Sequence, residues 1–192
     1  MSERWTRVRL EHRSQQGQMI VGAALGLLTE RGAGSLSMAA IAEAAHISRP
    51  TLYRYYRDVD AVLTGIADLV ASHDDLFEEA VAREPDPAAR LDLILGAVAG
   101  AGDHAAAAPA LHAALPPDGR EVLVRHETRV RRLLTETLAA GVDSGAFRRD
   151  LAPEADAPLL LGLARAADPG GTHRAIALAH RLVDPTPEER TS

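Results

Sequence analysis

Residues 37–56 read SMAAIAEAAHISRPTLYRYY, and their spacing predicts two short helices joined by a tight turn. Ser37 and Ser48 stand where a hydroxyl group caps the first turn of each helix. Pro50 follows in the first turn of the second helix, where no helical donor is lost. Small alanines surround the turn at 45–47, so the two helices can cross closely. The segment is therefore predicted to be a helix-turn-helix.

The second helix of this pair is expected to present donors and aromatic rings to the outside, a combination suited to phosphates and base edges. These outward side chains are Arg49, Thr51, Tyr53, Arg54 and Tyr55. Ile41, Ile47 and Leu52 are expected to be buried between the helices. A preceding helix at 16–31 would brace them. This pattern predicts a DNA-binding surface.

Charge is distributed unevenly along the chain. Residues 1–57 contain eight arginines and four glutamates, a net +4, whereas the remainder contains 13 arginines and 23 acidic residues, a net −10. A basic head on an acidic body is typical of a chain that contacts a polyanion with one end. Chance asymmetry with a solvated N-terminal arm is the alternative on charge alone.

The rest of the sequence predicts an all-α protein of about nine helices, because no alternating run reaches strand length. Asp58 is expected to cap a long fourth helix that ends before Glu84. Further apolar helical stretches lie between prolines and glycines. They are near 88–103, 109–115, 118–143, 154–167 and 172–183.

Composition excludes several classes of protein. Hydrophobic residues make up 46%, as in a folded globular chain, and the absence of cysteine excludes disulfides and thiolate metal sites. The longest apolar runs, at 20–28 and 91–101, are too short to span a membrane. Residues 1–14 alternate in charge and lack the apolar core of a secretion signal. A cytoplasmic protein without membrane contact is expected.

Residues 20–63 resemble the N-terminal domain of the TetR (tetracycline repressor) family of bacterial transcriptional regulators. The resemblance rests on small, apolar and tyrosine positions kept in order through three helices: Ile20, Ala23, Ala24, Leu27, Gly32, Ser37, Ile41, Ala42, Ala45, Ile47, Ser48, Thr51, Leu52, Tyr53, Tyr55, Tyr56 and Leu63. It implies a three-helix DNA-binding head and a larger helical body. The expected division is an N-terminal arm with a DNA-binding domain at 1–57, and an effector-binding and dimerisation domain at 58–192.

The resemblance also implies which residues contact DNA. Residues 48–56 would form the recognition helix in the major groove. Arg49 and Thr51 stand where the family reads bases, and Tyr53 and Tyr55 where it contacts phosphate and thymine methyl groups. The full set expected at double-stranded operator DNA is Ser37, Ser48, Arg49, Pro50, Thr51, Tyr53, Arg54, Tyr55 and Arg57.

Three positions depart from the family pattern. His46 replaces the usual turn glycine, so a left-handed backbone there would be strained. Ala39 stands where some members have a base-reading arginine, which would shift specificity onto the recognition helix. Val59 replaces a lysine at the start of the fourth helix, and Arg57 is expected to substitute for it. The arm, with Arg4, Arg7, Arg9 and Arg13, is either a further DNA contact or a solvated segment.

The resemblance implies a homodimeric repressor that binds a palindromic operator and is released by a small-molecule effector, expected to be apolar. Helical faces place one candidate wall for the effector in the body: Leu69, His73, Phe77, Leu91, Leu95, Leu111, Val130 and Leu134. The helices at 154–167 and 172–183 are very apolar for the end of a chain, so they are the expected dimer interface. No cofactor or metal is expected.

Two alternatives belong to other classes. One is a small helical metal-dependent enzyme that uses His73, Asp74 and His126, although no esterase, zinc-protease or phosphate-loop motif is present. The other is an effector-free DNA-binding protein, which would lack an internal cavity. A stripe of Arg125, Arg129 and Arg132 could suggest a second nucleic-acid face. Because Glu121 and Glu136 lie four residues from the ends of the stripe, a salt-bridged solvent face is favoured.

Overall fold

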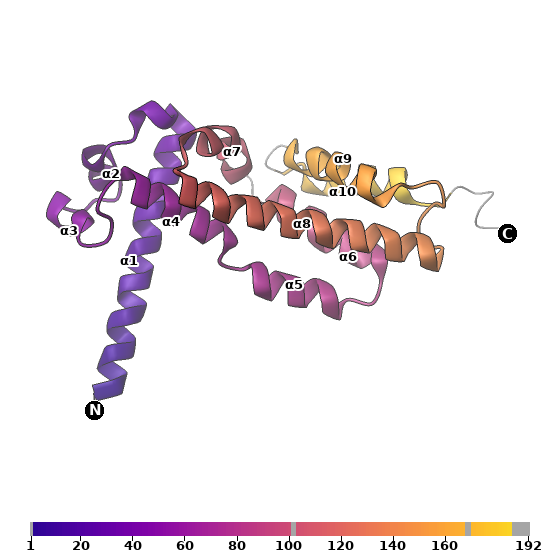
Figure 1. Cartoon of the computed structure of the whole chain (residues 1–192), viewed down its shortest axis with the longest axis horizontal. Helices are drawn as coiled ribbons and strands as arrows, with labels where there is room; N and C mark the ends of the chain where they lie inside the picture. Colours follow the sequence, from indigo (N-terminus) through magenta and orange to yellow (C-terminus); the bar gives the residue numbers. More distant parts are fainter. Residues whose placement is uncertain (1, 101–102, 168–169, 186–192) are drawn as a thin grey trace. The chain divides into compact units, whose positions relative to one another are not determined.

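The computed structural model describes residues 2–100, 103–167 and 170–185, with the side chains of 2–14 and 103–108 outside that description. Every regular element in these ranges is helical, which confirms the all-α prediction (Figure 1). The elements are α1 (Ser2–Arg31), η1 (Ala33–Ser35), α2 (Met38–Ala44), α3 (Arg49–Tyr53), α4 (Val59–Ala71), α5 (Asp74–Arg83), α6 (Pro87–Gly100), α7 (Asp103–Ala114), α8 (Pro117–Ser144), α9 (Pro153–Arg165) and α10 (Thr172–Val183). None of the helices in the described ranges is long and apolar enough to cross a membrane.

The chain divides into two compact units. The first consists of Met1–Ser72 with Ala106–Val124, and the second of His73–Ala105 with Arg125–Ser192. Each unit has its own cluster of buried apolar side chains. These units are defined by packing and not by function. The predicted boundary between a DNA-binding domain and an effector-binding domain after residue 57 therefore stays a prediction.

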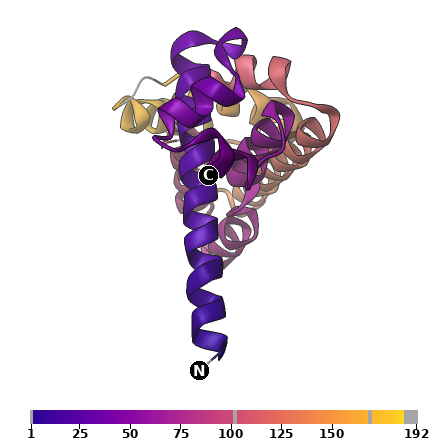
Figure 2. The same ribbon diagram turned by 90° about the vertical axis from the view of Figure 1, so that its left-hand side faces the viewer.

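The core of the first unit is built on α1, a long continuous helix (Figure 2). Ile20 is fully buried on α1, which packs against α2 and α4. Ile41 from α2, Leu52 from α3 and Ile66 from α4 are also fully buried in the same cluster. The helix-turn-helix is thus fixed to the unit by one large apolar side chain from each of its two short helices.

The second unit has a core of α6, α8, α9 and α10, together with the segment after α8. Leu91 and Leu134 are fully buried on α6 and α8, and Ala179 on α10. Phe147 is 1% exposed and lies over Gly141 of α8. By contrast, Val81 is the only buried residue of α5. The apolar packing of this unit therefore depends mainly on the four longer helices.

The predicted single helix from Asp58 to Glu84 is wrong, because the structure has two helices there, α4 and α5. The Ser72 hydroxyl donates to the Leu69 carbonyl at 2.7 Å, and the Ser72 amide donates to the same oxygen at 3.3 Å. His73 then leaves the helical region, with φ −109° and ψ 5°. A serine that competes for the backbone acceptor in this way tightens and ends the helix.

Two other predicted bounds also differ from the structure. The helix expected at 109–115 is α7, which starts at Asp103 and contains Pro109 in its interior. Four consecutive alanines at 105–108 favour the helix strongly enough to offset the donor that Pro109 lacks. The polar arm expected before residue 16 is part of α1, and the side chains of its arginines fall outside the described residues.

Candidate nucleic-acid interface

Serine side chains cap both helices of the helix-turn-helix, as the sequence predicted. Ser37 Oγ accepts a hydrogen bond from the Ala40 amide at 3.1 Å. Ser48 Oγ accepts one from the Thr51 amide at 3.3 Å, and the Ser48 and Thr51 hydroxyls lie 2.8 Å apart. Pro50 occupies the first turn of α3 without removing a helical bond. These bonds satisfy orphan amides at the start of helices that are too short to form alone.

His46 adopts the left-handed conformation that the sequence predicted for the turn. Its φ is 52°, and no other non-glycine residue in the described part of the chain has a positive φ. The His46 amide donates to the Glu43 carbonyl at 3.0 Å, and the Ile47 amide donates to the Ala42 carbonyl at 2.9 Å. These two bonds close the turn and hold His46 in its left-handed conformation, which sets the angle between α2 and α3.

The α3 helix has one buried and one open side. Leu52 is 0% exposed, whereas Tyr53 is 55% exposed. The other predicted contact residues divide in the same way: Ser37, Ser48, Arg49, Pro50, Arg54 and Arg57 are exposed, and Thr51 and Tyr55 are half-buried. The structure thus leaves the start of α3 open to a partner, including the guanidinium-bearing Arg49.

Arg57 and Asp58 form the junction between the helix-turn-helix and α4. Asp58 Oδ1 accepts from the Ala61 amide at 2.8 Å, which confirms the predicted cap of α4. Asp58 Oδ2 lies 3.1 Å from Arg57 Nε. The Arg57 side chain is 86% exposed, so the carboxylate orients the guanidinium without burying it. Val59, the first residue of α4, packs against the apolar core.

Tyr55 and Tyr56, which follow α3, both form hydrogen bonds to α1. No pattern in the sequence predicts that Gln16 is the partner of Tyr55. The Tyr55 hydroxyl donates to Gln16 Oε1 at 3.1 Å, and the Tyr56 hydroxyl donates to the Gly17 carbonyl at 3.4 Å. Burial, with a smaller contribution from the charge of Asp68, raises the pKa of Tyr56 above 10.0. Gln16 stands 39 positions from Tyr55, so no helical spacing relates the pair.

The eight candidate effector residues fall into three environments. Leu91, Leu95, Val130 and Leu134 are buried together in the core of the second unit, and Phe77 packs against it. Two others, Leu69 and Leu111, belong to the core of the first unit, and His73 is exposed. Five of the eight residues are therefore brought together, and three are not.

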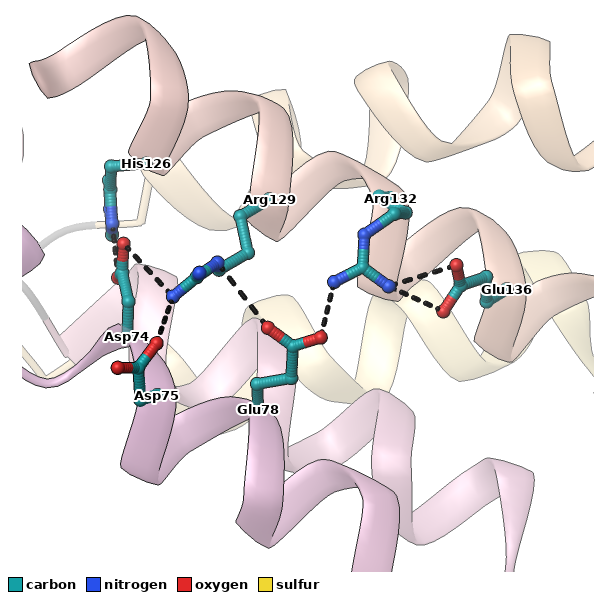
Figure 3. A network of polar contacts seen from close by, with 7 residues as sticks. All are labelled: Asp74, Asp75, Glu78, His126, Arg129, Arg132 and Glu136. Atoms are coloured by element: carbon teal, nitrogen blue, oxygen red, sulfur yellow. Dashed lines mark hydrogen bonds and ion pairs between the residues drawn. The ribbon is translucent and has the colours of Figure 1, made fainter.

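A network of ion pairs joins α5 to α8 in the second unit (Figure 3). Arg129 lies 2.7 Å from an Asp75 oxygen and 3.3 Å from a Glu78 oxygen. Arg132 pairs with Glu78 as well, and with Glu136 at 3.0 Å, the spacing noted in the sequence. Both arginines are thus engaged by carboxylates. This arrangement agrees with a salt-bridged face rather than a second nucleic-acid surface.

Two of the three residues in the metal-enzyme alternative belong to the same network. His126 Nδ1 lies 2.7 Å from Asp74 Oδ1, which is a direct hydrogen bond. The third residue, His73, is exposed. In the part of the chain that the structure describes, no group of three or more histidines and carboxylates is arranged to hold a metal ion.

The last two helices carry both buried and exposed leucines. Leu160, Leu161 and Val183 are buried within their own unit. The exposed set comprises Leu159 at 70%, Leu178 at 38% and Leu182 at 48%. Leu163 and Ile176 are half-buried. Of these eight apolar residues, three are therefore buried inside the chain, two are half-buried against its core, and three are exposed.

Comparisons with known proteins agree with this geometry. Residues 20–65 match the profile described as "Bacterial regulatory proteins, tetR family". No curated protein matches the sequence. Among solved structures, the chain is similar to the TetR family transcriptional regulator PfmR from Thermus thermophilus, with 22% identity, a TM-score of 0.71, and 85% and 92% of the two chains covered.

Two further solved structures carry ligands. FadR from Bacillus subtilis in complex with stearoyl-CoA has 16% identity, a TM-score of 0.63, and coverage of 86% of this chain and 94% of that one. AibR in complex with isovaleryl coenzyme A and operator DNA has 20% identity, a TM-score of 0.71, and coverage of 88% and 98%. At these identities the similarity shows a shared fold.

Proposed function

We propose that the chain is a ligand-responsive DNA-binding transcriptional regulator of the TetR family, because residues 20–65 match the model of that family of bacterial regulatory proteins. It acts as a repressor in the cytoplasm, not as an enzyme, and binds a palindromic operator as a homodimer. The observation that carries the proposal is the capped α2–turn–α3 unit, whose start presents Arg49 to solvent.

The proposed mode of reading DNA follows from the exposed side of α3. Arg49 is the first residue of this helix, the end that enters the major groove in helix-turn-helix proteins. Its guanidinium can pair bidentately with O6 and N7 of guanine. Tyr53, Arg54 and Arg57 are exposed toward the exit of the helix, where phosphate contacts fix orientation.

A dimer is proposed because two recognition helices must reach successive major grooves of a palindrome. The exposed leucines of α9 and α10, which are Leu159, Leu178 and Leu182, supply an apolar face for a second copy. Truncation after Asp150 removes both helices and should give a monomer or an aggregate in sedimentation. A truncated chain that stays dimeric would place the interface elsewhere.

The proposed effector is a largely apolar molecule bound in the second unit, where Leu91, Leu95, Val130 and Leu134 lie together. Acyl-coenzyme A thioesters are the first class to test, because their acyl chain is apolar, although coenzyme A itself is polar and anionic, and because the similar proteins FadR and AibR are seen with stearoyl-CoA and isovaleryl coenzyme A. Binding there would bias the dimer toward a state with lower operator affinity.

Selection of duplexes from a random DNA pool tests the DNA-binding function. The wild-type chain should enrich a palindrome. Arg49→Ala should lose about 1–3 kcal/mol per half-site and relax the preference at one symmetric base pair. Arg31→Ala, an exposed arginine at the end of α1, is the matched control and should bind as the wild type does. Unchanged affinity and base preference in Arg49→Ala would reject the recognition-helix assignment.

Release from the selected operator tests the effector. Stearoyl-CoA, isovaleryl-CoA and free coenzyme A are added to the complex, and the released fraction is measured. Release by a thioester but not by free coenzyme A would support an acyl effector. If no apolar small molecule releases the operator or raises the melting temperature, the effector-free alternative gains support.

A further inference from the structure

The recognition helix α3 has only five residues, so its direction depends on what holds its two ends. At its start, the Ser48 cap and the closed turn at His46 fix the backbone. At its middle, Leu52 is fully buried. Beyond its end, the chain continues through Tyr55 and Tyr56, and both hydroxyls reach α1. The segment that follows α3 is thus held by hydrogen bonds to α1, one to the side chain of Gln16 and one to the backbone carbonyl of Gly17.

The Tyr55 hydroxyl uses its proton in the hydrogen bond to Gln16. Tyr55 and Gln16 are both half-buried, and their hydroxyl and amide oxygen are 3.1 Å apart. A phenol carries a single proton, and a phosphate oxygen is an acceptor only. While Tyr55 donates to Gln16, it therefore cannot also donate to the DNA backbone, which is the role that family resemblance suggests for it.

The neighbouring tyrosine makes the same region of α1 rigid. Tyr56 lies in a close approach of α1 to α4, where a Cβ on Gly65 would come within 3.0 Å of the Tyr56 ring and 3.2 Å of Val21. Its hydroxyl reaches the carbonyl of Gly17, the residue next to Gln16. Consecutive residues of α1 thus hold consecutive tyrosines, so Gln16 cannot shift without disturbing this packing.

We propose that Gln16 is a positioning residue for operator binding, which acts by holding the Tyr55 hydroxyl and thereby orienting the exit end of α3 against α1. The inference rests on the proposed DNA-binding function. In this proposal Tyr55 makes a hydrogen bond within the protein and does not contact a DNA phosphate. The two residues should act as one unit, because removing either partner removes the same hydrogen bond.

A double-mutant cycle on operator affinity tests the proposal with Gln16→Ala, Tyr55→Phe and the double variant. Each single variant should bind the selected operator about 3- to 10-fold more weakly, the change that corresponds to one net hydrogen bond. The double variant should be no weaker than either single one. Gln15→Ala removes the adjacent, exposed glutamine and should match the wild type.

Gln16→Glu separates positioning from a general loss of stability. A carboxylate keeps the acceptor for the Tyr55 hydroxyl but adds a negative charge near DNA. Gln15→Glu adds the same charge one residue away, without the hydrogen bond. Gln16→Glu should bind as tightly as Gln15→Glu, whereas Gln16→Ala should bind more weakly than Gln15→Ala. Thermal denaturation of the DNA-free variants identifies a temperature at which every variant is folded, and all affinities are compared at that temperature.

Different outcomes overturn the inference and the proposed function. If the wild-type chain enriches no duplex, the proposed function fails before any variant is compared. If the wild type binds but Tyr55→Phe alone weakens binding, the hydroxyl contacts phosphate and the positioning role is wrong. Losses that add in the double variant, or a Gln16→Ala that matches Gln15→Ala, also overturn it.

Discussion

Among the glycines of the second unit that the structure describes, Gly141 leaves the least room for a Cβ, and replacing it with alanine should destabilise the protein. A Cβ at this position would lie 1.9 Å from Phe147 Cδ2 and 2.3 Å from Cε2. The ring cannot retreat freely, because Phe147 is 1% exposed and its amide donates to the Gly141 carbonyl at 3.0 Å. The backbone doubles back at Gly145, with φ 74°, which sets the ring directly over the helix.

The magnitude follows from two opposing effects. Alanine in a helix interior is favoured over glycine by about 1 kcal/mol. Forcing a methyl group into a packed site costs about 1–3 kcal/mol, and more where the backbone must move. Since the ring must shift by more than an ångström, the second effect dominates. We expect a net loss of about 1–2 kcal/mol in the free energy of unfolding, which corresponds to a melting temperature lower by roughly 2–8 °C.

Gly96→Ala is the matched control, because it lies in the interior of α6 in the same unit. A Cβ there would meet its nearest atom, Ile176 Cδ1, at 3.8 Å, an ordinary contact. It should therefore raise stability by about 0.5–1 kcal/mol. Thermal denaturation compares the two variants with the wild type. The cost of Gly141→Ala should also fall when Phe147 is already leucine. The packing argument is refuted if Gly141→Ala raises the melting temperature as Gly96→Ala does.

Three further predictions concern charged groups. Burial opposes protonation of His180, but hydrogen bonds and charges from Asp92 and Asp184 outweigh it and raise its pKa above 6.5. The charge-dependent part of the stability lost in His180→Gln should therefore be fully present below pH 6.5 and disappear as pH rises through the folded pKa, which denaturation at about pH 5.5 and 8.5 would measure. Glu78→Gln removes a carboxylate that pairs with two arginines of α8, so it should lower the melting temperature at low salt and have no effect in about 1 M NaCl. Arg57→Ala should weaken binding to all duplexes alike and flatten the salt dependence by about one unit for each phosphate that is no longer neutralised, whereas a base-specific effect would contradict its assignment to phosphate.

The parts of the fold that the sequence predicted correctly are those determined by neighbours in the chain. Ser37, Ser48 and Asp58 cap their helices through amides three residues away, and the pattern of residue types is sufficient to find them. The left-handed turn at His46 was instead implied by the family resemblance, in which this turn position is usually glycine. The buried Leu52 and the exposed Arg49 follow from helical periodicity.

The features that were missed depend on contacts between distant segments or on weak local competition. The break between α4 and α5 arises at Ser72, whose hydroxyl takes the Leu69 carbonyl, yet serine is also common inside helices. The partners of Arg129 on α5 lie about 54 residues away, so spacing could identify only the pairs within α8. Helical faces alone also grouped Leu69 and Leu111 with residues of a different core.

The same distinction explains why Gln16 escapes a sequence-based site assignment although it contacts Tyr55, just beyond the proposed recognition helix. Residues that touch a nucleic acid have a recognisable chemistry: arginine, exposed hydroxyls and aromatic rings on one short helix. A residue that orients that helix through Tyr55 needs only a hydrogen-bond acceptor at the correct place in space. From the sequence alone, the glutamines at 15, 16 and 18 are equally good candidates for that acceptor. Only the packing of Tyr56 against Gly17 and Gly65 decides which of them meets Tyr55. The side chains proposed to contact DNA can therefore be predicted from the sequence, whereas the Tyr55–Gln16 contact proposed to orient them joins residues 39 positions apart.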